Sequence, residues 1–158
     1  MRRVRAGEIV AGVAGVALLA AMFLDWYSMP PELLSGALDR RLRGVSAWEA
    51  FSVIDLLLAL CALAPLVLVA FQATRVSQSL PVMWSVLTTI AGMIAVLLVL
   101  YRLIDQPGPN ELVEVEPGAW IGLVAALAVV AGGWISMRTE AVPGLPLPPI
   151  EDLPAPAP

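Results

Sequence analysis

The sequence contains no histidine and no lysine, and it has one cysteine among 158 residues. Without histidine, the commonest general base and metal ligand of proteins is missing. The single Cys61 excludes an internal disulfide bond, and its place within an apolar run is typical of a small packing residue. The chain also lacks metal-ligand spacings, a nucleotide-binding loop and a nucleophile elbow. We therefore predict a protein that is not an enzyme, with no catalytic residues, metal or cofactor.

Charged residues are also scarce, at 14 % of the chain, whereas 59 % of the residues are apolar. The net charge of −4 provides no basic face to neutralise phosphates, which argues against nucleic acid as a partner. The charges occur in short clusters between long apolar runs, a pattern typical of a membrane protein with several spans. The lipid bilayer is thus the first partner that the sequence predicts.

Four apolar segments follow one another along the chain, at residues 9–27, 51–71, 82–101 and 119–137. Each holds about 20 residues and covers roughly the 30 Å of a hydrocarbon core as a helix. Lipid offers no hydrogen bonds to the backbone, so each segment should be helical. The tryptophans lie at or near the segment ends, as expected at the headgroup level; they are Trp26, Trp48, Trp84, Trp120 and Trp134. We predict an all-α membrane fold, a four-transmembrane-helix bundle.

The two ends of the chain should lie on the same side of the membrane, since four crossings return it to its starting side. Residues 1–8 are basic, which favours a cytoplasmic N-terminus and hence a cytoplasmic C-terminus. We expect the first segment to be retained rather than cleaved as a signal peptide, because it ends in aromatic residues and lacks a small-x-small site. Residues 138–158 are rich in proline and should form a disordered tail.

Asp55 is an ionisable residue within the second segment. It shares a small, partly polar helix face with residues three or four positions apart, namely Ser52, Ala59 and Ala62. The third segment has a matching face, made of Ser85, Thr88, Ala91, Gly92, Ala95 and Arg102. Small residues allow helices to approach closely in a bilayer, so both faces should point toward neighbouring helices.

Antiparallel packing of these two segments would bring Asp55 and Arg102 to the same, outer side. We predict an intramembrane polar pair between them, with packing around it from Ser52, Ala59, Thr88 and Ala95. Two simpler arrangements remain open: Asp55 bonded to Ser52 and water, or Arg102 paired with the nearby Asp105. A third alternative is a proton or cation site at Asp55.

The first loop, from Pro31 to Gly44, should form a short amphipathic helix on the membrane surface. Its basic residues would lie near lipid phosphates; they are Arg40, Arg41 and Arg43. A docking surface for a protein partner is the alternative. The third loop, "NELVEVEPG", is acidic and partly alternating, which indicates an extended segment. Rows of small residues on the first and fourth segments predict tight packing, with a row available for a homo-oligomer or another membrane protein.

The stretches "FLDWY", "GVSAWEAFSVIDLLLAL", "YRLIDQPGPN" and "GAWIGLVAALAVVAGGW" resemble small uncharacterised four-span membrane proteins of high-G+C Gram-positive bacteria. This resemblance implies a location in the bacterial cytoplasmic membrane and a topology, but no activity and no site. We therefore expect a structural or accessory subunit. The alternative is a small proton, cation or solute conduit that uses Asp55.

Overall fold

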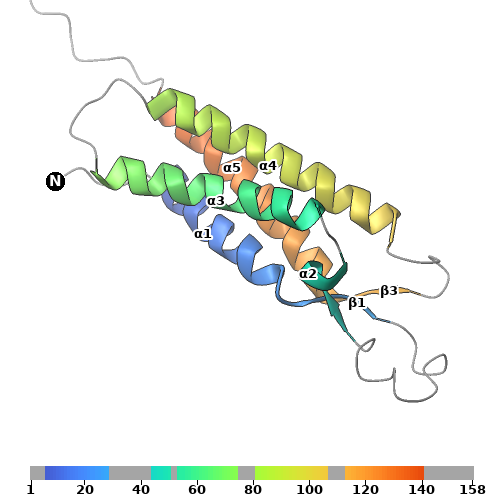
Figure 1. Ribbon diagram of the computed structural model, residues 1–158. Coiled ribbons are helices and arrows are strands. Elements are labelled where there is room, and N and C mark those ends of the chain that lie inside the picture. The colour runs from blue at the N-terminus through green and yellow to red at the C-terminus, as the bar shows by residue number, and fades with distance from the viewer. Residues whose placement is uncertain (1–5, 29–43, 51–52, 75–80, 107–112, 141–158) are drawn as a thin grey trace, which may run out of the picture.

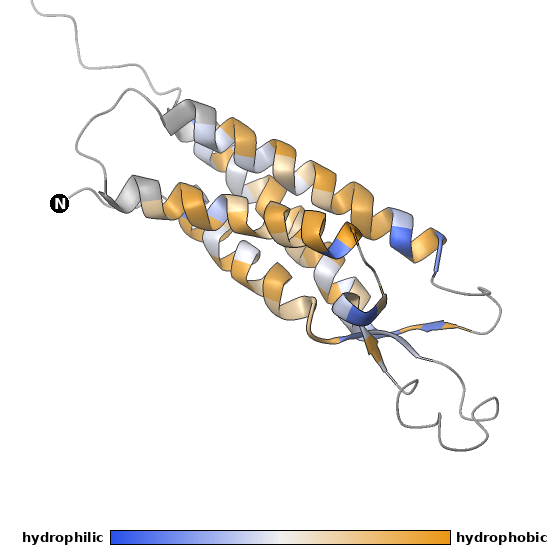
Figure 2. Cartoon of the chain, in the orientation of Figure 1, coloured by the Kyte–Doolittle hydropathy of each residue, from blue (hydrophilic) through white to orange (hydrophobic). Residues whose placement is uncertain are grey.

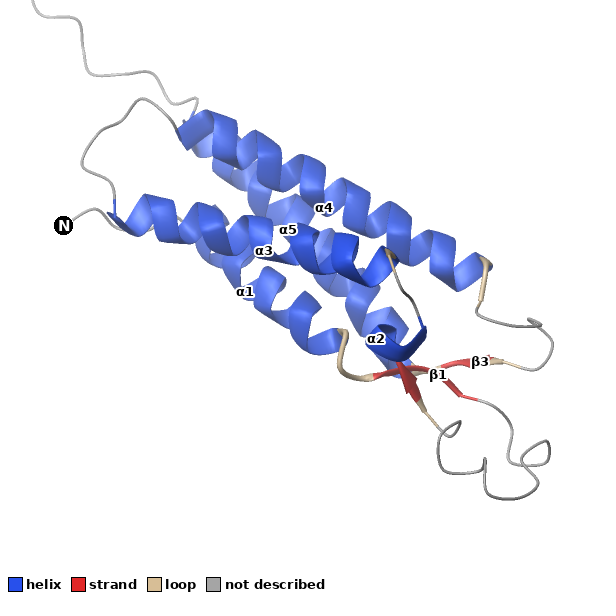
Figure 3. Ribbon diagram, viewed as in Figure 1, coloured by secondary structure: helices blue, strands red, loops and turns tan. Residues whose placement is uncertain are grey.

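Four long helices lie side by side, and three short strands gather at one end of them (Figures 1 and 3). The computed structural model describes residues 6–28, 44–50, 53–74, 81–106 and 113–140. The helices are α1 (Ala6–Ala21), α2 (Ala47–Ala50), α3 (Ile54–Thr74), α4 (Pro81–Ile104) and α5 (Pro117–Glu140). The strands are β1 (Asp25–Ser28), β2 (Val45–Ser46) and β3 (Glu114–Val115). The described chain is thus mostly helical.

The long helices pack in a ring, in which α1 contacts α3 and α5, and α4 contacts the same two helices. Helices α1 and α4 end near the strands, whereas α3 and α5 begin there, so neighbours in the ring run antiparallel (Figure 1). We call this the strand end, and the opposite end, where α1 and α4 begin, the open end. Proline at the first position of α4 and of α5 suits a helix start, where its missing N–H costs nothing.

Glycine allows these helices to approach at backbone distance. A Cβ atom added at Gly132 would lie 2.5 Å from the backbone nitrogen of Ala11, and one at Gly15 would lie 2.6 Å from Pro65 Cγ. Similar contacts join Gly7 to Ser136, Gly92 to Val130 and Gly133 to Thr89. The small-residue rows that the sequence offers for self-association are therefore occupied within the chain.

Apolar residues run along most of the length of the helices (Figure 2). Many large apolar side chains are exposed on the outside, while others, such as Leu18, Leu58 and Leu68, are buried between the helices. Two helical stretches, Trp84–Ile104 and Pro117–Arg138, are long and apolar enough to cross a membrane. Only 33 % and 44 % of their most apolar windows are buried, so most of their residues face outward. The described parts of α1 and α3 are apolar but shorter, at Ala6–Ala21 and Ile54–Ala70.

The strands form an antiparallel sheet in the order β2-β1-β3, with β1 in the middle. Tyr27 is opposite Val45 on one side and Val115 on the other. The backbone N–H of Glu116 also donates to the carbonyl of Trp26 at 2.9 Å, and the Ser28 hydroxyl donates to the Glu116 carboxylate at 2.6 Å. The sheet thus joins the segments that follow α1 and precede α5.

The sheet corrects two expectations. A purely α-helical fold is wrong, and the first apolar segment does not continue as a helix to residue 27. Helix α1 ends at Ala21, and after a turn the chain enters β1. The aromatic pair Trp26-Tyr27 favours a strand, and antiparallel partners from two other loops are available at this end. The expected extended third loop is present in part, as β3.

Other boundaries differ less. Helices α3, α4 and α5 overlap the predicted segments 51–71, 82–101 and 119–137 with shifts of three residues or fewer. Because α5 continues through Arg138 to Glu140, the first three residues of the predicted tail 138–158 are helical. The predicted surface helix with Arg40, Arg41 and Arg43, and the tail beyond residue 140, lie outside the described residues.

Candidate functional site

Asp55 lies in the first turn of α3, at the strand end. It is only 4 % exposed, and its Oδ1 atom accepts no hydrogen bond from the residues that the structure describes. Burying a carboxylate is costly unless a charge or a donor compensates. Arg102, in the last turn of α4, interacts electrostatically with the Asp55 carboxyl group and offsets part of this cost.

The predicted neighbours of this pair are only partly gathered around it. Ala59 and Ala95 are buried, one turn from Asp55 and two turns from Arg102. Thr88 is fully buried on the same face of α4, but it precedes Arg102 by about 21 Å of helix rise and thus lies toward the open end. Ser52 lies outside the described residues.

Asp105, the alternative partner of Arg102, accepts a hydrogen bond from Tyr101. The Tyr101 hydroxyl donates to Asp105 Oδ2 at 2.5 Å on the exposed side of α4. The Arg102 guanidinium carbon lies 5.8 Å from the centre of the Tyr101 ring. Arg102 thus has the exposed Tyr101 ring as a neighbour and interacts electrostatically with the buried Asp55.

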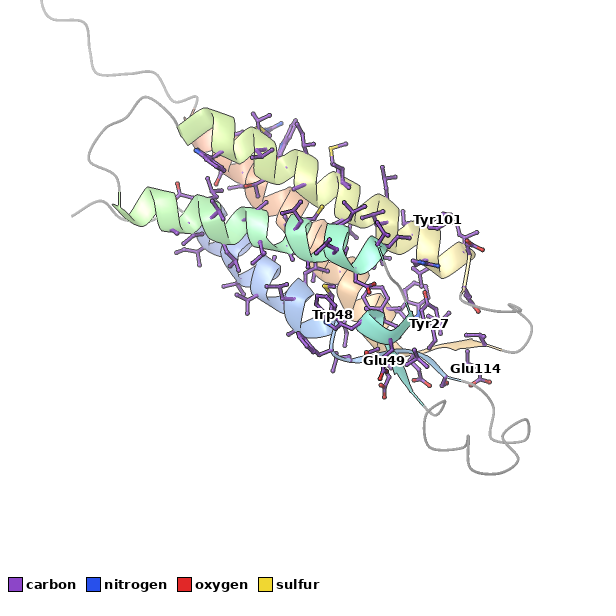
Figure 4. The ribbon with its side chains drawn as sticks, viewed as in Figure 1. Tyr27, Trp48, Glu49, Tyr101 and Glu114 are labelled. Carbon is purple, nitrogen blue, oxygen red and sulfur yellow. The ribbon has the colours of Figure 1, made fainter. Side chains whose placement is uncertain are left out.

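Tyr27 is the third member of this cluster, and the sequence did not indicate it. Its side chain is 2 % exposed, and its hydroxyl donates to the backbone carbonyl of Arg102 at 2.8 Å. This bond fastens β1 to the last turn of α4 (Figure 4). Burial raises the pKa of Tyr27 to about 12, against the opposing effect of the Arg102 charge. The phenol therefore stays neutral and remains a donor. We name Tyr27, Asp55 and Arg102 the strand-end cluster.

Trp26, next to Tyr27, is not part of an aromatic belt. It is 0 % exposed, and its indole N–H donates to the carbonyl of Ala21 at 2.7 Å. Its ring lies against Gly122 of α5, where an added Cβ would lie 2.7 Å from the ring. The expectation that Trp26 faces the headgroup level is wrong, because the strand turns the ring inward and α5 provides a glycine to receive it.

A second group of buried polar side chains lies toward the open end. Glu8, in the first turn of α1, is 4 % exposed, although the sequence analysis assigned it to the basic cytoplasmic N-terminus at 1–8. The Thr89 hydroxyl donates to the Ser85 carbonyl at 2.9 Å. Ser136 is fully buried against α1. A charged residue at the start of an apolar run gives no signal of the face it will occupy, which explains why Glu8 was missed.

Neither group has the composition of a metal site, since no three Asp, Glu, Cys or His side chains converge within the described ranges. A groove of about 620 Å³ lies elsewhere, between α1 and α5. Its lining is apolar and includes Val13, Ala14, Ile121 and Val124. The strand-end cluster thus connects secondary-structure elements to each other and does not line this groove.

No known protein family, curated protein or solved structure matches the chain.

Proposed function

We propose that the chain is an integral protein of the bacterial cytoplasmic membrane that crosses the bilayer four times, through α1, α3, α4 and α5. The strand end would face outward and both termini would be cytoplasmic. The protein would act as a structural or accessory subunit and not as an enzyme. The antiparallel order of the four helices supports this topology, since it brings all three strands to one end.

The distribution of side chains between inside and outside is the observation that carries the proposal. The fully buried positions include Ser85, Thr88 and Ala95, whereas Val13, Leu60 and Leu97 are each at least 64 % exposed. Water-soluble proteins bury their large aliphatic residues and rarely expose wide apolar patches. Small and weakly polar residues between helices, with aliphatic residues outside, are typical of helices packed in lipid.

Membrane insertion is tested by extraction and by reporter fusions. We expect the protein to stay with membranes in alkaline carbonate and to dissolve only with detergent. Reporters placed at the N-terminus and in the loop at 75–80 should lie in the cytoplasm, and those in the loops at 29–43 and 107–112 outside. Release by carbonate, or loops 29–43 and 107–112 on opposite sides, would overturn the topology.

The accessory role is supported by the structural part that the strand-end cluster plays, since its groups hold other elements in place and do not line the apolar groove between α1 and α5. The Tyr27 hydroxyl secures β1 to α4, and the proposed pair of Asp55 with Arg102 would attach α3 as well. The acidic side chains of Glu49 and Glu114 are exposed at the same end (Figure 4). A photo-crosslinker at either position should capture a second membrane protein in cells. The matched control places the crosslinker at Leu127, on the lipid-facing side of α5. Capture of nothing but the protein itself would count against an accessory role.

A conduit is the second candidate, favoured by the buried Asp55 oxygen, which accepts no hydrogen bond from the described part of the chain. The polar side chains, however, fall into two groups at opposite ends, and Ala59, Ala62, Ala91 and Ala95 lie between them on α3 and α4. This gap supports the structural role. Proton or cation flux into liposomes should be absent and unchanged in Asp55→Asn. Flux in the original protein that Asp55→Asn removes, with the fold retained, would establish the conduit.

A further inference from the structure

Exposed aromatic side chains from several elements gather at the strand end. Phe23 is 70 % exposed and Trp48 is 40 % exposed, and their rings lie 5.7 Å apart. Tyr101 at the end of α4 and Trp120 at the start of α5 are 50 % and 55 % exposed. These residues come from four separate parts of the chain, and the fold brings them to the same end of the helices. We call them the strand-end belt.

Exposed aromatic residues are also present toward the open end. Trp134 on α5 is 52 % exposed, and the guanidinium carbon of Arg138 lies 5.3 Å from the centre of its ring. Trp84, near the start of α4, is partly exposed. Aromatic rings with a polar N–H or O–H favour the boundary between hydrocarbon and headgroups, and the Arg138 charge favours phosphates. Together these residues form the open-end belt.

The two belts are closer together than an average hydrocarbon core is thick. Trp120 and Trp134 are fourteen residues apart on α5, which is about 21 Å of helix rise. Trp84 and Tyr101 are seventeen residues apart on α4, or about 26 Å. A typical hydrocarbon core measures about 30 Å. Any tilt of the helices would shorten the separation further.

We propose that the protein fits a thin bilayer, with a hydrocarbon core of about 21–26 Å, formed by lipids with short acyl chains or thinned locally around the protein. This inference rests on the proposed membrane insertion. Helix length alone would not predict it, because the 24 residues of α4 rise about 36 Å. In a thicker bilayer, however, Trp134 and Arg138 would be drawn into hydrocarbon, where the charge is costly.

The test uses the full chain in phosphatidylcholine vesicles of increasing thickness, with myristoleoyl, palmitoleoyl, oleoyl or erucoyl chains. Flotation first shows whether the protein is incorporated, and circular dichroism then gives its melting temperature. We expect the highest melting temperature in myristoleoyl or palmitoleoyl vesicles and a progressive fall in the longer chains. A maximum in oleoyl or erucoyl vesicles would overturn the thin-bilayer inference alone. Failure to incorporate in any vesicle would overturn the proposed membrane insertion.

A variant pair sharpens this test. Trp134→Leu with Arg138→Leu removes the open-end belt of α5 and lengthens its apolar face by about one turn. The melting-temperature maximum should then move at least one step toward longer chains. Ile135→Leu, at an exposed apolar neighbour, is the matched control and should leave the maximum in place. An unmoved maximum in the double variant would show that the belts do not set the preferred thickness.

Discussion

The strand end and the open end of the four helices are held together by different interactions. At the strand end, hydrogen bonds connect residues far apart in sequence, such as Tyr27 to Arg102 and Ser28 to Glu116. Toward the open end, glycines let the helix backbones approach closely, as between Gly132 and Ala11. Hydrogen bonds between distant residues thus characterise the strand end, and close backbone approach characterises the packing of α1 against α5 toward the open end.

This difference matches the surroundings that we propose for the two ends. Segments outside the hydrocarbon core can form strands, because their remaining backbone groups reach water or headgroups. Helices within lipid have their backbone bonds satisfied internally, so van der Waals packing between small residues stabilises their association. At the strand end, substitutions that remove a hydrogen bond or a buried side chain should therefore lower the free energy of unfolding. Toward the open end, substitutions that enlarge a small side chain between helices should do so.

The largest effect is expected at Trp26, which combines both kinds of interaction at the strand end. Trp26→Ala removes a fully buried ring and its hydrogen bond to Ala21. Loss of a buried aromatic side chain typically costs about 3–5 kcal/mol of unfolding free energy. Unfolding in mixed detergent micelles measures this cost. The exposed Trp120→Ala serves as control and should cost far less; similar losses for both variants would remove the distinction between buried and belt tryptophans.

Added volume toward the open end should have the next largest effect. Gly132→Val places side-chain atoms against the α1 backbone and should lower the unfolding free energy by about 1–3 kcal/mol. The neighbouring Ala131 is exposed, so Ala131→Val is the control, since it introduces the same side chain at a position that does not face another helix. If both variants unfold alike, close packing of α1 against α5 does not stabilise this end.

The pairing of Asp55 with Arg102 is tested by a double-mutant cycle with Asp55→Asn and Arg102→Gln. Each single change should destabilise the protein, and the two together should cost less than the sum of the single costs. Groups in one network typically show a coupling free energy of about 1 kcal/mol or more. Additive costs in detergent unfolding would mean that Arg102 does not support Asp55, and the proposed pair would be wrong.

Tyr27 provides the smallest and most specific test. Tyr27→Phe removes one hydrogen bond to the Arg102 carbonyl and should cost about 1 kcal/mol below pH 10. Because the pKa of Tyr27 is raised from 10.0 to about 12, the folded state binds this proton more tightly than the unfolded state. Its stabilising contribution is therefore complete below pH 10 and is lost as the pH rises through 12.

Measuring the free energy of unfolding between pH 10 and 12 distinguishes the original protein from Tyr27→Phe. The unfolding free energy of the original chain should fall more steeply between pH 10 and 12 than that of Tyr27→Phe. Trp120→Phe is the control, since this exposed ring does not titrate and its replacement should leave the slope unchanged. Equal slopes for the original protein and Tyr27→Phe would contradict the assigned role of the buried phenol.

The sequence predicted the helices better than the site. Apolar length and the small-residue faces located α3, α4 and α5, because both follow directly from composition and a 3.6-residue period. The face carrying Ser85, Thr88 and Ala95 is buried, as small residues at that spacing indicate. Whether all four helices span a membrane, and whether Asp55 and Arg102 form a functional pair, stay predictions.

What the sequence missed depends on contacts between distant segments. Residues 25–28 form a strand because the segments at Val45 and Val115 pair with them, and the sequence does not show which distant segments will pair. Asp25, which interrupts the apolar run, was the signal that the helix ends earlier. The burial of Glu8 likewise depends on which face of α1 packs against α5. That face is determined in part by Gly132, which is more than one hundred residues away in the sequence.

The position of β1 in the middle of the sheet has a consequence for biosynthesis. Its two neighbours are made later than β1, and the residues of β3 are synthesised only after roughly seven tenths of the chain. Helix α1 likewise cannot form its glycine contacts with α5 until α5 has been synthesised. Nascent chains interrupted before Pro117 would thus display unmatched surfaces at both ends, which suits recognition by chaperones and membrane proteases.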